Sequence, residues 1–450
     1  MERAPLGRPT PEDLERYAAR RARVAELLGP DGVLVLPAGP EVVVVGRDLE
    51  LRYRPDPDLY YLTGYTEPSA VLVLAPGHDE GEFWLFVRPR DPDRERWTGV
   101  RGGPEAAREV YGADVAAPLT ELEERLPALL RGREAIYYPL GAGPEPVERI
   151  VRQVFERARA TRQRRGIGPR RLSDPGVILD DLRLIKDPHE LTLIREAALI
   201  TAEGLIEAAP SIAPRAGEWE VEAALEAAFR RRGAEGVGFG TIVASGANAT
   251  VLHYIDNRRR MAAGELVVID AGAHYRGYNG DISRTFPVSG RFSPLQRELY
   301  DAVLEAHDRA IAAVRPGATP GDVHQAALRV LVEAMVSFGL LKGEVDGLIE
   351  SEEYRKFYPH QTSHWLGLDV HDVGEYAIRG KPRPLEPGMV LTVEPGIYVP
   401  EDAEDAPPEL RGLGIRIEDD VVVTEAGHEI LTAGIPVQAD RIEELLRRSG

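Results

Sequence analysis

Two segments of this chain repeat one pattern, in which an apolar run ends in a carboxylate and a glycine follows two residues later. The segments are Gly264-Glu-Leu-Val-Val-Ile-Asp270-Ala-Gly272 and Gly388-Met-Val-Leu-Thr-Val-Glu394-Pro-Gly396. Each apolar run is typical of a strand buried on both faces. A lone buried carboxylate costs more free energy than such a strand recovers unless its charge is paired or bound to metal. The repeat therefore predicts an internally duplicated domain in which Asp270 and Glu394 meet a partner.

A returning strand follows the first copy and carries a second acid. A turn at Tyr275 and Arg276 would fold this strand back and place Asp281 opposite Asp270. Opposed residues of an antiparallel pair lie on one face with Cβ atoms about 5 Å apart. Two ionised carboxylates this close repel each other, so one of them stays protonated unless a cation is present.

The second copy has the same layout. A polar loop over 401–409 follows the first strand, and the returning strand ends at Glu418. The midpoint between Glu394 and Glu418 falls inside that loop, so these two acids are also expected to face each other. Two such hairpins, related by duplication, would bring four acids to one centre.

The composition narrows the partners that these acids can have. The chain has 450 residues, a formal net charge of -19 and no cysteine. Without thiolates, a metal would have to bind oxygen and imidazole.

The acidic balance argues against binding of nucleic acid, which needs a basic face. The N-terminus lacks an apolar signal segment and no apolar stretch reaches the ~18 residues of a membrane span. We therefore expect a cytoplasmic protein that binds no membrane.

The order of apolar strands and amphipathic helices predicts two domains. In the first, short strands alternate with helices, and the expected strands lie over 32–36, 70–75, 82–87 and 135–138. A basic stretch over 163–171, rich in Gly and Pro, shows no periodicity and marks the boundary. The helices expected beyond it lie over 187–209, 218–233, 293–315 and 320–339. The predicted domains are an α/β domain over 1–172 and an α+β domain over 173–450, whose helices enclose a mixed or antiparallel sheet.

Three histidines fall close together between Tyr358 and Asp372, namely His360, His364 and His371. Oxygen ligands with one imidazole suit hard or borderline divalent metals such as Mn, Fe or Co better than structural zinc. Two metals about 3.5 to 4 Å apart need bridging carboxylates, and four acids provide them. We therefore expect Asp270 to be a metal ligand.

The motifs around these residues resemble those of the pita-bread metallopeptidase family, which includes methionine aminopeptidases, prolidases and aminopeptidase P. They are Val-Val-Ile-Asp270, Gly280-Asp281-Ile-Ser-Arg-Thr-Phe286, Ser363-His364-Trp-Leu-Gly-Leu-Asp-Val-His371-Asp and Thr392-Val-Glu394-Pro-Gly-Ile-Tyr398. They most resemble the aminopeptidase P branch, because prolidases tend to carry Gly-His where this chain has Ser363-His364. The first domain is similar to the amino-terminal domain of that branch at Asp58-Leu-Tyr-Tyr-Leu-Thr-Gly64.

This resemblance implies a fold and a metal centre. The fold would be an α/β amino-terminal domain followed by an α+β pita-bread catalytic domain with an internal pseudo-two-fold repeat. The five metal ligands would be Asp270, Asp281, His364, Glu394 and Glu418. They would hold two divalent metal ions, with Mn expected and Co, Fe or Zn as alternatives, and Asp281 and Glu418 would bridge both ions.

The resemblance also implies a reaction. The chain would be an Xaa-Pro aminopeptidase, which removes the N-terminal residue from peptides with proline in the second position. A hydroxide that bridges the two metals would attack the scissile carbonyl. Glu394 would carry the proton to the leaving nitrogen, while His253 and His371 would stabilise the developing oxyanion.

Three further residues match substrate-side positions of the family. His360 matches a residue that lines the proline pocket. Arg416 and Tyr398 resemble the residues of the family that support the metal ligands from outside. Arg416 precedes Glu418 by two residues, which places both on one strand face. An arginine there can orient acids through bidentate hydrogen bonds, and a plain salt bridge is the alternative.

Other functions stay open at this stage. The nearest is an Xaa-Pro dipeptidase, or prolidase, on the same fold. A non-catalytic relative could use the cleft to bind peptides. A creatinase-like hydrolase uses the fold without metal, which the complete ligand set argues against. Family members are commonly dimers or tetramers, so we expect a homo-oligomer of one of these sizes.

Overall fold

The computed structural model describes residues 7–39, 43–45, 49–141 and 143–447. The chain forms two compact units that divide between Leu182 and Arg183. The sequence placed the domain boundary between residues 172 and 173, and strand β8 (Arg171–Ser173) and helix α7 (Gly176–Leu184) lie in this region.

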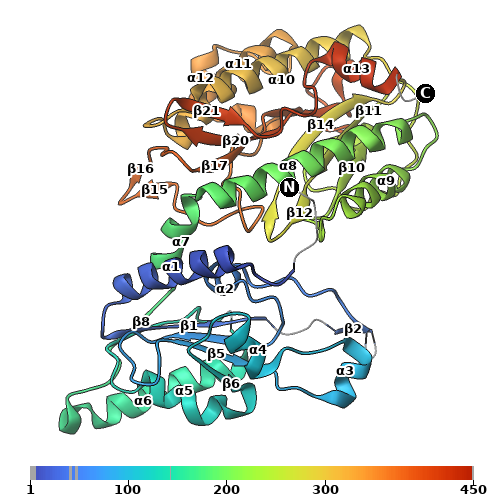
Figure 1. Ribbon diagram of the computed structural model, residues 1–450. Coiled ribbons are helices and arrows are strands. Elements are labelled where there is room, and N and C mark those ends of the chain that lie inside the picture. Colours follow the sequence, from blue (N-terminus) through green and yellow to red (C-terminus); the bar gives the residue numbers. More distant parts are fainter. Residues whose placement is uncertain (1–6, 40–42, 46–48, 142, 448–450) are drawn as a thin grey trace. The chain divides into compact units, whose positions relative to one another are not determined.

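The first unit is built on a six-stranded mixed sheet with strand order β6-β5-β4-β1-β7-β8. Besides β8, the strands of this sheet are β1 (Gly32–Pro37), β4 (Val71–Leu74), β5 (Phe83–Val87), β6 (Val115–Pro118) and β7 (Ala135–Tyr137). In Figure 1, helix α1 (Pro11–Leu28) covers one face of this sheet, and α5 (Leu122–Leu130) and α6 (Glu145–Arg165) cover the other. A sheet covered on both faces needs apolar residues at every position, and all of β1 is buried. The four expected strands are confirmed, each to within a residue at either end.

The stretch over 163–171 is not entirely a loop. Helix α6 continues to Arg165, and β8 begins at Arg171. Arginine is a good helix former, so the end of α6 extends through a polar sequence that shows no apolar period.

The second unit contains the four expected helices, which are confirmed. They are α8 (Pro188–Ala208), α9 (Glu218–Arg231), α10 (Pro294–Ala313) and α11 (Pro320–Ser337). A capping box precedes α8, α10 and α11, with proline as the first helical residue in each. Helix α8 packs on α9, and α10 packs on α11. Among the described residues, no helix combines the length and apolarity that a bilayer crossing requires.

Antiparallel strands accompany each helix pair, as the repeat in the sequence predicts. In Figure 1, α8 and α9 lie beside the first group of strands and α10 and α11 beside the second. The first group is β10 (Ile242–Ser245), β11 (Leu266–Ala271) and β14 (Ile282–Pro287). The second comprises β17 (Val390–Val393), β20 (Asp419–Thr424) and β21 (Gly427–Ile430), with the pair β18 (Gly396–Tyr398) and β19 (Gly414–Arg416).

The turn of the first hairpin lies one residue later than the sequence suggested. Tyr275 of β12 (Ala273–Tyr275) faces Tyr278 of β13 (Tyr278–Asn279), so the turn residues are Arg276 and Gly277. Their φ angles are 49° and 91°. A type I′ turn requires positive φ at both central residues and favours glycine at the second. The preference for glycine at the second turn position therefore explains why the turn lies at Arg276 and Gly277.

This shift corrects the expected pairing of the first two acids. Asp270 pairs with Ser283, and Asp281 is not its direct partner. Moving a turn by one residue changes the pairing by two, which keeps every side chain on its original face. Asp281 consequently still lines the same cavity as Asp270.

The second hairpin has the expected register. Val393 faces Asp419 in one strand pair and Gly396 faces Arg416 in the next. Glu394 and Glu418 lie between these pairs, so they stand opposite each other as predicted.

The glycine that ends each repeat permits close approach of the returning chain. A Cβ added at Gly272 would lie 1.9 Å from the carbonyl oxygen of Gly280, and one at Gly396 would lie 2.7 Å from that of Ile415. Only glycine fits both positions without displacing backbone.

Candidate metal centre

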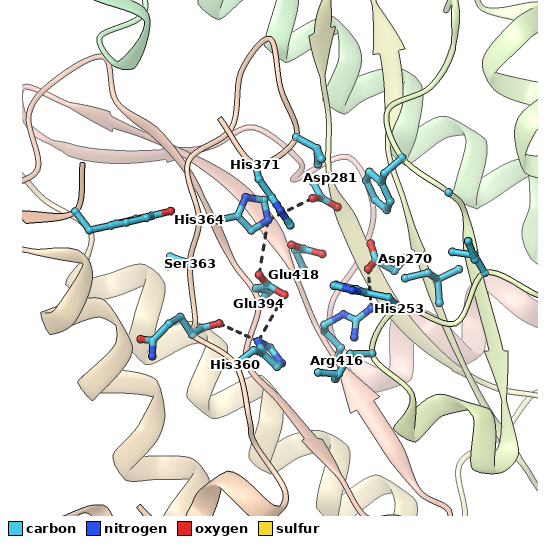
Figure 2. A pocket seen from close by; sticks show the side chains of 18 residues that line it. His253, Asp270, Asp281, His360, Ser363, His364, His371, Glu394, Arg416 and Glu418 are labelled. Carbon is cyan, nitrogen blue, oxygen red and sulfur yellow. Dashed lines mark hydrogen bonds and ion pairs between the residues drawn. The ribbon is translucent and has the colours of Figure 1, made fainter. Parts of the chain in front are cut away.

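The acids at the strand ends of the second unit open onto one cavity of about 600 Å³, a volume typical of small-molecule sites. Of the residues predicted for the site, all except Tyr398 line this cavity. They are His253, Asp270, Asp281, His360, His364, His371, Glu394, Arg416 and Glu418 (Figure 2). The structure therefore brings together residues that are far apart in the sequence.

The carboxylates in this cavity repel one another. Burial and the neighbouring Glu418 raise the pKa of Asp281 well above its usual range. Burial and Asp270 raise the pKa of Glu418 to about 8, and burial with Glu418 raises the pKa of Glu394. Crowded acids of this kind keep protons unless a cation replaces them.

The imidazole of His364 presents an unprotonated nitrogen to the acids. Its Nδ1 lies 3.0 Å from the carbonyl oxygen of Trp365, which can only accept, so Nδ1 donates and Nε2 keeps its lone pair. Nε2 is 3.6 Å from Oδ2 of Asp281 and 3.7 Å from Oε1 of Glu394. Burial lowers the pKa of His364 to about 4. The neutral ring is therefore ready to bind a cation between these acids.

The arrangement fits a divalent cation. Ligand atoms of Asp281, His364 and Glu418 lie within 4.8 Å of one another. Oδ1 of Asp270 and Oδ1 of Asp281 are buried and have no hydrogen-bond partner in the part of the chain that the structure describes. Buried polar atoms without a partner are costly, and a bound cation would satisfy both. Asp270 and Glu394 lie outside the group of three but line the same cavity.

One arginine orients two of the acids. Arg416 donates from Nη2 to Oδ2 of Asp270 at 2.6 Å and from Nε to Oγ of Ser283 at 2.7 Å. Ser283 in turn donates to Oε2 of Glu418 at 2.8 Å. Ser283 was not predicted as a site residue, although it lies two residues after Asp281 and therefore on the same strand face.

The same arginine supports His360 through Tyr398. Nη1 of Arg416 donates to the Tyr398 hydroxyl at 3.1 Å, and this hydroxyl is 2.9 Å from Nε2 of His360. Nδ1 of His360 donates to the carbonyl oxygen of Gln361 at 2.8 Å, so Nε2 must accept from Tyr398. Burial and Arg416 lower the pKa of His360 to about 3, which keeps this chain of donors fixed.

The remaining two histidines lie on loops at the cavity. The ring of His371 packs edge-on against that of His364 with centroids 4.4 Å apart. His253 lies on the side of Asp270 and Arg416 (Figure 2). Both His253 and His371 are exposed, so a ligand in the cavity can reach them.

Sequence reasoning missed the apolar part of the cavity wall. In its loops these residues are Phe239, Leu252, Ile255, Val370 and Tyr376, and Ile242 comes from β10. The ring of Tyr376 stacks on Trp365 at a centroid distance of 5.1 Å. Single apolar residues in loops have no periodicity, so no pattern in the sequence identifies them.

Each of the two units matches a known protein family. The sequence matches "Metallopeptidase family M24" over residues 192–425 and "Aminopeptidase P, N-terminal domain" over residues 17–137. The Xaa-Pro aminopeptidase of Escherichia coli K12 is 41% identical over 433 residues, which are 96% of this chain and 97% of that protein.

Solved structures of aminopeptidases are similar to this chain over nearly its whole length. The Pseudomonas aeruginosa aminopeptidase PepP matches with a TM-score of 0.93 at 42% identity, covering 100% of this chain and 99% of that one. Zinc-substituted Escherichia coli aminopeptidase P in complex with product matches with a TM-score of 0.92 at 40% identity, covering 99% of this chain and 100% of that one. The chain thus belongs to metallopeptidase family M24.

Proposed function

We propose that this protein is a metal-dependent Xaa-Pro aminopeptidase, which hydrolyses the bond between an N-terminal residue and a following proline. The observation that carries this proposal is the meeting of the two repeated acid pairs with His364 in one cavity. Likeness to Xaa-Pro aminopeptidases over nearly the whole chain supports the choice of reaction.

The proposed ligands of two divalent cations are Asp270, Asp281, His364, Glu394 and Glu418. Carboxylates with one imidazole and no thiolate suit Mn best, with Co, Fe or Zn as alternatives. When bound, such cations lower the pKa of water enough to supply hydroxide near neutral pH.

Glu394 is the proposed proton carrier. It lines the cavity beside His364. Its carboxylate would take a proton from the attacking water and deliver it to the proline nitrogen as the carbon–nitrogen bond breaks.

Histidines on both sides of the acids would hold the substrate. His253 and His371 would donate hydrogen bonds to the scissile carbonyl oxygen and stabilise the charge that develops there. His360, fixed by Tyr398 and Arg416, would contact the proline. Proline has no backbone N–H and a restricted φ, so an apolar wall that asks for no hydrogen bond from it favours Xaa-Pro peptides.

Peptide cleavage tests this proposal. The Mn-loaded protein should convert Ala-Pro-Ala to Ala and Pro-Ala and leave Ala-Ala-Ala intact. Cleavage of Ala-Pro but not of Ala-Pro-Ala would make the protein a dipeptidase. Failure to bind Mn or to cleave any of these peptides would indicate a peptide-binding relative. The homo-oligomeric state, dimer or tetramer, and the cytoplasmic location stay predictions, which light scattering and cell fractionation test.

A further inference from the structure

The loop that carries His253 has no helix or strand over 251–259, and the His253 side chain is exposed. A histidine that stabilises an oxyanion must be held in place before the substrate arrives, because a group that moves during the reaction stabilises little. The position of this ring therefore depends on what anchors the loop.

Glu218 anchors the segment that precedes His253. It is the first residue of α9 and its exposed fraction is 0%. Its Oε1 accepts hydrogen bonds from the Ser245 backbone N–H at 2.9 Å, the Ser245 hydroxyl at 2.7 Å and the Asn248 side-chain amide at 3.1 Å. These partners end strand β10 and form the short helical turn over 246–250 that leads to His253.

The other oxygen of Glu218 anchors the segment that follows His253. Oε2 accepts from the Tyr254 hydroxyl at 2.9 Å and from the Arg259 backbone N–H at 2.8 Å. The Glu218 backbone N–H also donates to the carbonyl oxygen of Arg259 at 2.9 Å. One side chain thus joins both ends of the loop.

An ionised carboxylate is the form that these partners require. Backbone and amide N–H groups only donate, and a carboxylate accepts on both oxygens. Helix α9 begins at Glu218, where the helix dipole favours negative charge. The guanidinium of Arg259 lies on the same network, 3.0 Å from Oγ of Ser245. Moving either end of the loop away would strip hydrogen bonds from this buried carboxylate, which is costly.

We infer that Glu218 is a positioning residue for the hydrolytic reaction, which holds His253 toward the scissile carbonyl by joining both ends of its loop. This inference rests on the proposed function, because it assigns His253 a contact with substrate. Glu218 itself lies outside the cavity wall and acts through the loop.

Substitution of Glu218 by glutamine separates positioning from packing. Glutamine has the same shape, but its amide nitrogen cannot accept a hydrogen bond. In either orientation of the amide, this nitrogen therefore faces the donors of one of the two segments that flank His253. The Tyr254 hydroxyl can rotate to avoid this conflict, whereas the Arg259 backbone N–H cannot. Glu218→Gln should therefore loosen the loop without leaving a cavity.

A double-mutant cycle with His253→Ala tests the inference on the Mn-loaded enzyme. In the wild-type background, Glu218→Gln should lower kcat for Ala-Pro-Ala by up to about 100-fold, with little change in KM and in metal content. In the His253→Ala background the same change should cost less than about twofold, because residues that act as a unit are not additive. Equal losses in both backgrounds, or no loss in the first, would overturn the inference.

Glu190→Gln is the matched control. Glu190 is also buried, lies in the first turn of α8 and accepts from the Tyr278 hydroxyl at 2.8 Å. Any loss from Glu190→Gln should multiply with that from His253→Ala. If it is non-additive as well, the coupling is general and the inference fails. Tyr254→Phe removes a single donor to Glu218 and gives the same test should Glu218→Gln not fold.

Hydrogen exchange on the metal-free protein gives a second readout that needs no activity. Glu218→Gln should speed exchange in residues 246–259 and leave α8 unchanged, and equal protection of that segment in both proteins would refute the inference. The outcomes separate the two proposals. A wild-type protein that cleaves no Xaa-Pro peptide refutes the function, whereas an active wild type with an additive cycle refutes only the role of Glu218.

Discussion

Arg416 donates a hydrogen bond of 2.6 Å to Oδ2 of Asp270, while Oδ1 of the same carboxylate is buried without a partner among the residues described. Arg416 also reaches Ser283, which donates to Glu418. One arginine thus orients two acids and leaves an oxygen of Asp270 available to a cation. Partners of this kind fix ligands in place and tune their affinity for metal.

Arg416→Lys should weaken metal binding by about 10- to 100-fold. Lysine keeps the charge but has no planar fork, so it cannot serve Asp270, Ser283 and Tyr398 together. Metal retained after dialysis at a series of free Mn concentrations measures the effect. Arg411→Lys is the control, since the hydrogen bonds of Arg411 within the described part of the chain go to the carbonyl oxygens of Ala406 and Glu404. Wild-type affinity in Arg416→Lys would show that the arginine does not orient the ligands.

Glu394→Gln should lower turnover of Ala-Pro-Ala by about 10² to 10⁴-fold. Glutamine neither takes a proton from water nor gives one to the proline nitrogen. Circular dichroism should be unchanged, and metal analysis of the same sample separates loss of proton transfer from loss of metal. A variant as active as the wild type would exclude Glu394 as the proton carrier.

The metal-free protein should lose stability as the pH rises. Burial and Asp270 raise the pKa of Glu418 from its ordinary 4.5 to about 8, and Asp281 and Glu394 shift in the same direction. A carboxyl whose pKa is raised by folding contributes stability below its ordinary pKa, and this is lost as the pH rises through the folded value.

The melting temperature of the metal-free protein should therefore fall as the pH rises from about 5 through about 8. Added Mn should suppress this fall, because the cation takes the place of the protons. A metal-free melting temperature that is constant or rises over this range would mean that the acids are not crowded as the structure indicates.

Asp372→Asn should destabilise the second unit. The side chain of Asp372 is 1% exposed and accepts from Arg183 at 2.6 Å and from Lys186 at 2.8 Å. Removing the anion leaves two buried cations short of a partner, which costs about 3–5 kcal/mol. Asp369→Asn is the control, because Asp369 also contacts Arg183 but its side chain is 40% exposed, where a pair is worth at most about 1 kcal/mol. Equal unfolding midpoints for the two variants would contradict the assignment.

The stability that the ion pairs of Asp372 contribute should depend on pH. Burial alone would raise the pKa of Asp372, but Lys186 and Arg183 outweigh it and the net shift is downward. A lowered pKa contributes stability above the ordinary value of 3.8, and this is lost as the pH falls through the folded value. The gap in urea midpoint between wild type and Asp372→Asn should therefore narrow below about pH 4.

The elements that the sequence predicted are those whose burial leaves a pattern. Strand β1 is buried along its whole length and reads as a continuous apolar run, and the capped helices α8, α10 and α11 have clear starts. The second hairpin was predicted correctly because Glu394 and Glu418 lie symmetrically about one polar loop. The first was wrong by one turn residue, because the positive φ of Gly277 outweighed simple symmetry.

The meeting of the acids with His364 could be predicted because repeated strand ends carry them. The residues that support them could not. Ser283 and Glu218 make their contacts only after distant segments fold together, and a single polar residue in a strand or at a helix start looks like any other. Tyr376 reaches the cavity from a loop, whose path no local pattern specifies.

The five predicted ligands should gather two divalent cations in this cavity. Anomalous diffraction at the manganese edge, from crystals grown with Mn, tests this most directly. We expect two peaks about 3.5 to 4 Å apart, both within bonding distance of Asp281 and Glu418. An empty cavity, or manganese bound only elsewhere on the molecule, would contradict it.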